Sequence, residues 1–213
     1  MKLYLPIITF FLSLTITFTS HAQRTTEIGF TGGAIRFYPE AQRLGSNRNN
    51  SMDNGWGFSA GIFAEDHWKP KIHQVVEINY YNLSSDVFLQ KNPEGPWAPN
   101  DGTGRQPVYG NYQNSSFNQL AVSGGVKLFL NNKLFIYPEF ELMRALNKKV
   151  DIHRTTYNAK LGAGVNLELF DIILEYSYGL NNQRTVYDSS VPFATAHTNN
   201  FLQLKVQVPF YQF

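Results

Sequence analysis

The sequence predicts an all-β fold: an eight-stranded antiparallel up-and-down β-barrel that spans a membrane. Three observations predict it. Apolar and polar residues alternate with a period of two in eight segments, the connections between these segments are alternately short and long, and aromatic residues gather near both ends of the segments. Period-two alternation gives each strand one apolar and one polar face. A small transmembrane barrel needs this pattern, because its outside meets lipid and its inside is polar.

Composition narrows the class of protein. The chain has 213 residues, of which 43% are hydrophobic, 15% aromatic and 16% charged. The length suits one domain or two small ones, and the charged share is below the roughly 25% of an average soluble domain. A formal charge of +2 produces no field that would gather nucleic acid. Because cysteine is absent, disulfides, thiolate metal sites, a cysteine nucleophile and a lipoprotein anchor are excluded.

The first residues have the features of a secretory signal peptide. Lys2 precedes an apolar run over Leu3–Phe18, and small residues occupy the positions that signal peptidase reads before Gln23. An uncleaved membrane anchor is the alternative, but the run is shorter than the roughly 20 residues that a spanning helix needs. We therefore expect a signal peptide over 1–22 and a single exported barrel domain over 23–213.

The eight alternating segments are the predicted strands. The clearest alternation covers 118–130, where leucine and valine occupy one face and glutamine, serine and lysine the other. These segments exceed the five or six residues usual in soluble sheets and suit a tilted crossing of a bilayer. The predicted strands cover about 26–38, 54–64, 71–82, 116–130, 134–146, 154–168, 172–180 and 200–211.

The connections between the strands fall into two classes. The short ones are 65–70, 131–133 and 170–171, whereas the long or polar ones are 39–53, 83–115, 147–153 and 181–199. Transmembrane barrels place short turns in the periplasm and long loops outside the cell. We therefore expect the long connections to be extracellular.

Aromatic residues near the strand ends predict two girdles at the headgroup level, where an aromatic ring buries its body and keeps its polar edge wet. The alternative is the general preference of aromatics for strand ends. Near the short turns lie Trp68, Phe129, Phe135, Phe170, Phe210, Tyr211 and Phe213. Near the other end lie Phe37, Tyr38, Trp56, Tyr80, Tyr81, Phe117, Tyr157 and Phe201.

Taken together, these features resemble the small OmpA/OmpX-type outer-membrane β-barrel family, a porin-like architecture. The resemblance rests on the signal peptide, the eight alternating segments, hairpins such as 122–130 turning through Asn131-Asn132-Lys133 into Leu134-Phe-Ile-Tyr137, and the terminal Phe213. It covers nearly all of the mature chain.

That resemblance implies a location in the outer membrane of a Gram-negative cell, with outer-membrane lipid and lipopolysaccharide as neighbours. It also implies insertion by the β-barrel assembly machinery, with Phe213 as the assembly signal. Pro138 and Pro209 depart from an uninterrupted strand pattern. Because proline cannot donate to a strand ladder, we expect a bulge or a strand start at each.

The polar faces of the strands predict a charged network in the barrel lumen. An eight-stranded barrel is only wide enough for side chains to fill it, and a buried charge without a partner costs several kcal/mol. We therefore expect the network to plug the lumen; a narrow cation path or proton relay along its glutamates is the alternative. The predicted network comprises Glu77, Lys127, Glu139, Glu141, Lys160, Glu168, Glu175 and Lys205.

The extracellular loops contain the candidate contact residues. Trp97 stands among prolines in the 83–115 connection, and a tryptophan of this kind can contact a partner, a glycan or lipopolysaccharide. The alternative is a flexible tip whose tryptophan rests on the barrel rim. Arg43 and Arg48 in the first loop are candidates for lipopolysaccharide phosphates. An extracellular or peptidoglycan-associated partner is left open.

Residues for catalysis, metal or cofactor binding do not stand out. His197 precedes the last strand, as in lipid A deacylase barrels, but Asn199 stands where their nucleophilic serine would be. His67, His73 and His153 lack the ligand spacing of a zinc site along the chain. We therefore predict no catalytic residue, no metal site and no cofactor.

The sequence thus favours a non-enzymatic outer-membrane barrel with a structural or surface-interaction role through its loops. Three alternatives remain: an enzyme acting on outer-leaflet lipid, a narrow ion-conducting pore, and a soluble lipocalin-like barrel. A glutamate-lined interior disfavours the last, because it would repel an apolar ligand, and the apolar outer strips would then be unexplained.

Overall fold

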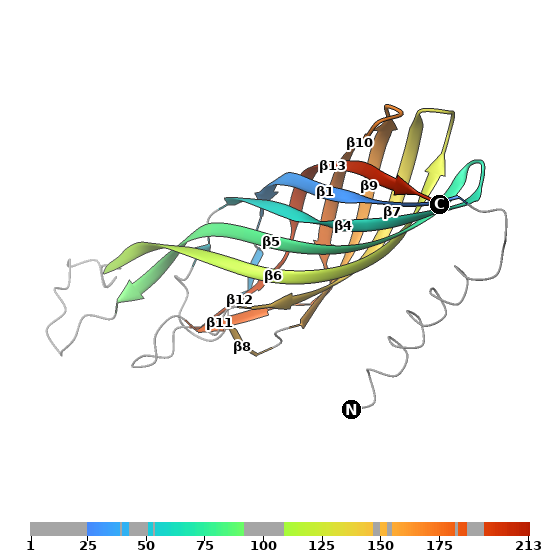
Figure 1. Ribbon diagram of the computed structural model, residues 1–213. Helices are drawn as coiled ribbons and strands as arrows, with labels where there is room; N and C mark the ends of the chain where they lie inside the picture. The colour runs from blue at the N-terminus through green and yellow to red at the C-terminus, as the bar shows by residue number, and fades with distance from the viewer. Residues whose placement is uncertain are drawn as a thin grey trace, which may run out of the picture.

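Eight long antiparallel strands form a closed barrel in the computed structural model (Figure 1). The structure describes residues 25–38, 40–42, 51–52, 54–91, 109–146, 150–152, 155–181, 183–186 and 194–213. Each strand pairs with its neighbour in the chain, and β1 pairs with β13 to close the ring, so the predicted up-and-down topology is confirmed. The barrel strands are β1 (Thr26–Phe37), β4 (Gly55–Lys69), β5 (Ile72–Lys91), β6 (Tyr109–Phe129), β7 (Leu134–Ala145), β9 (Thr155–Asn166), β10 (Asp171–Gly179) and β13 (Phe201–Gln212).

The seam between the first and last strands contains one of the two predicted irregularities. Thr26 and Phe213 exchange backbone hydrogen bonds of 2.9 and 3.0 Å. Ile28 pairs with Tyr211 and Gly29 with Pro209, so the intervening residue on β13 forms a bulge. The bulge predicted at Pro209 is confirmed, since the missing proline N–H interrupts the ladder there.

Pro138 behaves differently from the prediction. It pairs with Leu161 in an uninterrupted β7–β9 register. On the other side, the β6–β7 pairing stops after Glu139 and resumes at Ile136 in the same register. Proline therefore removes a hydrogen bond from one ladder without adding a residue, and no bulge forms.

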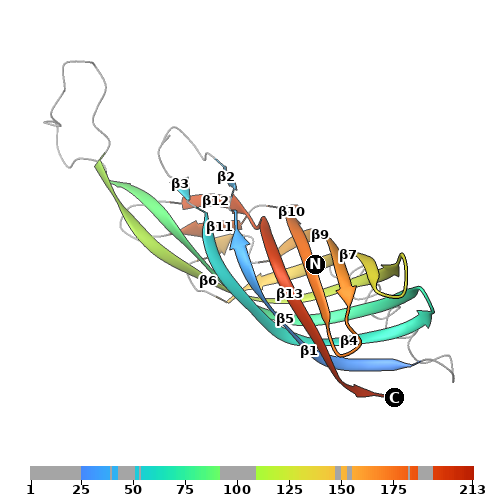
Figure 2. The ribbon, with the colours of Figure 1, turned by 90° about the horizontal axis from the view of Figure 1, so that it is seen from above.

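The hairpin of β5 and β6 is much longer than the prediction. The connection expected over 83–115 is strand at both ends, and pairing continues to Lys91 opposite Tyr109. β4 and β7 leave this hairpin near Ser84 and Gln119. Beyond that point the hairpin projects past the barrel as a ribbon (Figures 1 and 2), and the short β3 (Ser51–Met52) pairs with it at Val87 and Phe88.

Short strands occupy the other long connections at the same end of the barrel. β2 (Glu40–Gln42), β12 (Ala194–Thr198), β11 (Gln183–Val186) and β8 (Val150–Ile152) form a four-stranded sheet, and β3 (Ser51–Met52) pairs with β5. The two chain ends of the barrel and its short turns lie at the opposite end, where the C-terminus is marked (Figure 2). The predicted sorting of connections by length is confirmed.

The outer surface is apolar on every barrel strand. This arrangement follows from period-two alternation, and it confirms that the apolar faces point outward. In the part of the chain that the structure describes, no helix is long and apolar enough to cross a membrane. Exposed apolar residues of the strands include Phe30, Phe58, Ile62, Ile78, Leu120, Ile136, Phe140, Leu161, Leu174, Leu204 and Val206.

The predicted aromatic girdles are correct only in part. Trp68, Phe210, Tyr211 and Phe213 are exposed near the short turns, as are Tyr38 and Trp56 near the loops. Five other members of the proposed girdles point inward, because they lie on the opposite phase of their strands and fill the lumen instead. These are Phe37, Tyr81, Phe117, Phe135 and Phe201, all buried.

Candidate functional site: the charged lumen

Six charged side chains meet in the middle of the lumen, and we call them the central network. They come from β5, β7, β9, β10 and β13, at strand positions whose side chains alternate inward. The structure buries all six, and their paired side chains have no exposed surface. The central network consists of Glu77, Glu139, Glu141, Lys160, Glu175 and Lys205.

Lys160 is shared by three of these carboxylates. Its Nζ lies 2.8 Å from Glu141 Oε2, 2.9 Å from Glu175 Oε1 and 3.7 Å from Glu139 Oε1. It also donates a hydrogen bond to the Tyr81 hydroxyl at 3.0 Å. One ammonium group thereby joins β5, β7 and β10 to its own strand β9.

Lys205 is likewise shared by three carboxylates. Its Nζ lies 2.9 Å from Glu77 Oε1, 3.0 Å from Glu175 Oε2 and 3.6 Å from Glu139 Oε2. Glu175 therefore bridges the two lysines with its two oxygens. Charge-assisted contacts of this length are among the stronger hydrogen bonds in proteins.

Neutral side chains satisfy part of the remaining carboxylate capacity. Tyr137 and Gln207 donate to Glu77 Oε1 at 3.0 and 2.7 Å, and Asn79 donates to Glu77 Oε2 at 2.7 Å. Tyr81 donates to Glu141 Oε2 at 2.7 Å. Buried polar groups are tolerated when they are paired in this way.

Carboxylates nevertheless exceed ammonium groups in the central network, four to two. Neither oxygen of Glu139 has a hydrogen-bond partner, and its distances to Lys160 and Lys205 are the longest in the network. Glu139 is therefore the carboxylate whose charge is least compensated.

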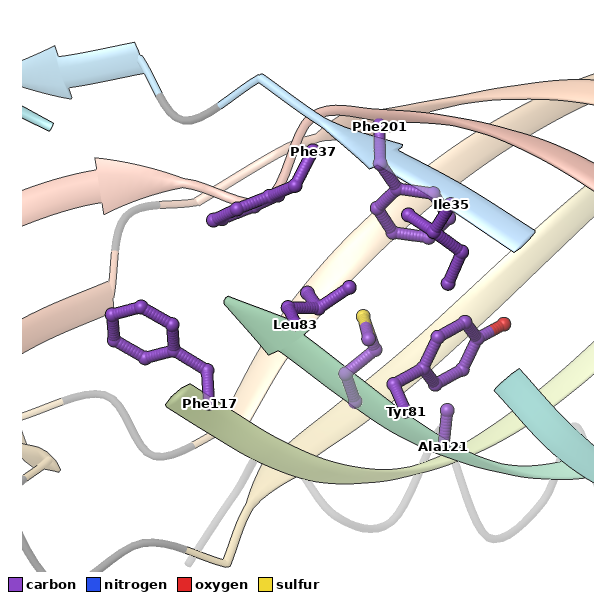
Figure 3. Close-up of a cluster of buried hydrophobic side chains, with 8 residues drawn as sticks. Ile35, Phe37, Tyr81, Leu83, Phe117, Ala121 and Phe201 are labelled. Atoms are coloured by element: carbon purple, nitrogen blue, oxygen red, sulfur yellow. The ribbon is translucent and has the colours of Figure 1, made fainter. Parts of the chain in front are cut away.

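Apolar layers lie on both sides of the charges. Toward the long loops, eight buried residues fill the lumen, among them Phe37, Leu83, Phe117 and Phe201, whose side chains point toward one another (Figure 3). Toward the short turns, a second buried cluster comprises Phe63, Val75, Phe135, Tyr137 and Ile173. Buried apolar side chains therefore lie in the lumen on both sides of the central network.

A second polar cluster lies beyond the apolar cluster of Phe63, Val75, Phe135, Tyr137 and Ile173, at the mouth of the barrel next to the short turns. Lys127 pairs with Glu65 and lies 2.5 Å from Asp171 Oδ2. His73 Nδ1 lies 2.6 Å from Glu65 Oε1, and the His67 and His73 rings stack at 4.0 Å. A cavity of about 70 Å³ opens beside them.

The structure places most of the predicted network where the sequence put it. Seven of the eight residues are buried inside the barrel, although Lys127 belongs to the mouth and not to the central network. Glu168 is a correction. It lies exposed in the turn after β9 with φ of 67°, because the strand ends at Asn166 and alternation no longer sets its direction.

Several candidates lie elsewhere or outside the described residues. Arg43, Arg48, Trp97 and His153 fall outside them. The backbone of His197 pairs with Gln183 in the loop-end sheet. Asn199 is fully buried and donates hydrogen bonds to Gln119 at 3.3 Å and Thr156 at 3.1 Å.

Sequence reasoning missed Glu65 and Asp171, which bind Lys127. Both lie just outside the predicted strand bounds, at 64 and 172. Glu65 becomes inward-facing because β4 continues to Lys69, and Asp171 begins β10. Extending the alternation by one residue in each case was the available signal.

Comparison with known proteins identifies similar folds only. No family model and no curated protein matches the sequence. The structure is similar to OprG from Pseudomonas aeruginosa, at 10% identity over 88% of this chain and 95% of that chain, with a TM-score of 0.46. It is also similar to Ail, the attachment invasion locus protein of Yersinia pestis, at 11% identity over 88% and 99% with a TM-score of 0.40.

A third similar structure is the outer membrane protease OmpT from Escherichia coli, at 9% identity over 90% of this chain and 98% of that chain, with a TM-score of 0.34. The architecture itself rests on the strands and side chains described above. Eight antiparallel strands with an apolar outer surface and a charged interior make this chain a closed up-and-down β-barrel, the architecture that the sequence predicts.

Proposed function

We propose that this protein is a sealed, non-enzymatic outer-membrane scaffold that acts through the structures at its long-loop end. The burial of the central network between two apolar layers supports the seal. A solvated path through the lumen would have to break ion pairs shared by Lys160 and Lys205, and the carboxylates left behind would be buried without partners.

Planar-bilayer recording tests the seal. We expect the refolded mature protein to give no current steps above the background of the detergent alone. Steps in the wild-type protein that disappear in a Glu139→Gln, Glu141→Gln variant would instead establish a conducting path along the glutamates, and the proposal would fail. Glu168→Gln is the matched control, since Glu168 lies exposed in a turn.

The projecting ribbon supports a surface-interaction role. Strand pairing runs from Asp86 opposite Asn114 to Lys91 opposite Tyr109, which extends the hairpin by about 20 Å at 3.4 Å per residue. A partner or a neighbouring surface would meet this ribbon before it meets the barrel rim.

Replacing 86–114 by a two-residue Asn-Gly turn between Ser85 and Ser115 tests that role, because those residues already pair and Asn-Gly favours a tight hairpin. We expect the variant to keep its heat-modifiable gel mobility, the shift between unboiled and boiled samples that marks a closed barrel. The cells that express it should attach less to protein-coated surfaces. Unchanged attachment at equal surface abundance would contradict a role for the ribbon.

The absence of an enzymatic role is part of the proposal. At the position where a lipid A deacylase carries its serine, Asn199 is buried and bonded across the lumen. We expect the lipid A mass spectrum of expressing cells to be the same for the wild type and for His197→Ala. A difference between the two would favour the lipid-modifying alternative.

A further inference from the structure

We propose that Glu65, His67 and His73 bind a divalent transition-metal ion of the Zn²⁺ class at the short-turn mouth of the barrel. The three residues lie on β4 and β5, on both sides of the turn at Pro70 and Lys71. Their ligand atoms all lie within 4.8 Å of one another. Spacing along the chain predicted no such site, because the hairpin register brings these residues together.

The distances suit a small ion. Glu65 Oε1 lies 2.6 Å from His73 Nδ1 and 3.7 Å from His67 Nε2. Zinc bonds to nitrogen and oxygen are about 2.0–2.2 Å long, so tetrahedral ligand atoms stand roughly 3.3–3.6 Å apart. The ion therefore requires the His73–Glu65 contact to open by less than about 1 Å, after His73 loses its Nδ1 proton. It also requires the stacked His67 and His73 rings to tilt apart so that both nitrogens face the ion.

The other oxygen of Glu65 is already fixed. Lys127 contacts Glu65 Oε2, and Asp171 Oδ2 holds the same ammonium group at 2.5 Å. Oε1 is consequently the oxygen directed toward the histidines. Hydrogen-bonded partners behind a ligand orient it in the same way in known metal sites. The His73 ring also packs against Phe129, with the two ring centroids 4.6 Å apart.

The charge around the site favours a cation. Glu27 lies opposite Glu65 in the β1–β4 register, and its Oε1 is 3.7 Å from His67 Nε2. Like charges directly opposite on neighbouring strands destabilise a sheet. Asp171 and Glu168 line the same cavity. A divalent ion would offset this excess, which Lys127 alone does not balance.

Solvent can reach the site. The His67 side chain is 28% exposed and that of His73 is 13% exposed, beside a cavity of about 70 Å³. This volume holds several water molecules, each of which needs about 10–15 Å³. An ion can therefore enter with part of its hydration shell, and a water molecule can complete the coordination of three protein ligands.

The ligand set selects the class of ion. Imidazole nitrogens suit Zn²⁺, Cu²⁺ and Ni²⁺, whereas Ca²⁺ and Mg²⁺ prefer sites built from oxygen alone. Two imidazoles and one carboxylate should therefore bind Zn²⁺ and leave Ca²⁺ and Mg²⁺ unbound at the same concentration.

Isothermal titration with Zn²⁺ is the test, on mature protein refolded in detergent, stripped with chelator and free of any polyhistidine tag. We expect one ion per chain, and no heat with Ca²⁺ or Mg²⁺. The His67→Ala, His73→Ala double variant should lose this binding. His197→Ala removes a histidine at the opposite end of the barrel and should bind as the wild type does.

Two results would overturn the site. One is the absence of zinc binding by the wild-type protein, and the other is equal binding by the double variant. If the double variant does not regain heat-modifiable mobility, the Co²⁺ absorption spectrum of the wild type decides. An intense tetrahedral band that Zn²⁺ removes supports the site, and a weak octahedral spectrum contradicts it.

Discussion

Lys160 is a shared contact of several side chains in the lumen. It contacts Glu139, Glu141 and Glu175 and donates to Tyr81. Its ring neighbours add to this, since Nζ lies 5.5 Å from the centroids of both Tyr81 and Phe201, within the range of a cation–π interaction.

Lys160→Met should destabilise the folded barrel strongly. Removal of one partner from a buried ion pair costs about 3–5 kcal/mol, because the opposite charge remains buried without compensation. Urea unfolding in detergent micelles measures the difference in the free energy of unfolding. Lys133→Met, in the exposed turn between β6 and β7, is the matched control and should unfold as the wild type does. A small effect at Lys160 would show that the network contributes little to stability.

At the scale of the element, β13 closes the barrel through its backbone while the side chain at its end remains exposed. Phe213, the residue after β13, exchanges two backbone hydrogen bonds with Thr26, but the residue is 62% exposed. The seam at this point is therefore made by the backbone, and the Phe213 side chain is not needed for it.

Phe213→Ala should separate assembly in the cell from folding in detergent. We expect less protein in the outer membrane of expressing cells, because the terminal aromatic side chain is the proposed signal for the assembly machinery. Refolding in detergent, followed by heat-modifiable mobility on gels, should be unchanged. Tyr211→Ala removes another exposed aromatic, two residues earlier in β13, and should leave cellular assembly intact. Equal loss in both variants would contradict a specific role for Phe213.

At the scale of the whole molecule, the apolar outer surface makes a prediction that separates a membrane barrel from a soluble one. Leu161 lies in the middle of β9 and is 63% exposed, and Leu169 lies in the turn after β9 and is 77% exposed. Both side chains leave the barrel, but only the first would lie deep in lipid.

Leu161→Arg should reduce the stability of the barrel folded in lipid vesicles by about 2–4 kcal/mol, the cost of arginine near the bilayer midplane. Leu169→Arg, near the interface, should have little effect. Equilibrium unfolding in denaturant measures both. In a soluble barrel neither substitution would be costly, so equal and small effects would reject the membrane orientation.

Much of this architecture could be predicted from the sequence because the period of two is a local property. Each clearly alternating strand indicates which of its residues face outward, and the length of each connection indicates the end of the barrel at which it lies. The central network followed from the same alternation, since Glu77, Glu139, Lys160 and Lys205 each stand on the polar phase of their strands. Glu168 was misplaced because alternation carries no information beyond the end of a strand.

The sequence by itself therefore determined the number and order of the barrel strands, the outward faces of the strands after residue 64 and the charged character of the lumen. The outward faces of the first two strands were left to the structure. Only the tertiary structure decided which charges meet, because pairing across a barrel depends on the register of strands far apart in the chain. Only the structure shows that Phe37, Tyr81, Phe117 and Phe201, which the phase of their strands turns inward, pack into one cluster beside the network. The β4–β5 register also places His67 and His73 next to Glu65. The spacing of these residues along the chain does not predict that they lie close together.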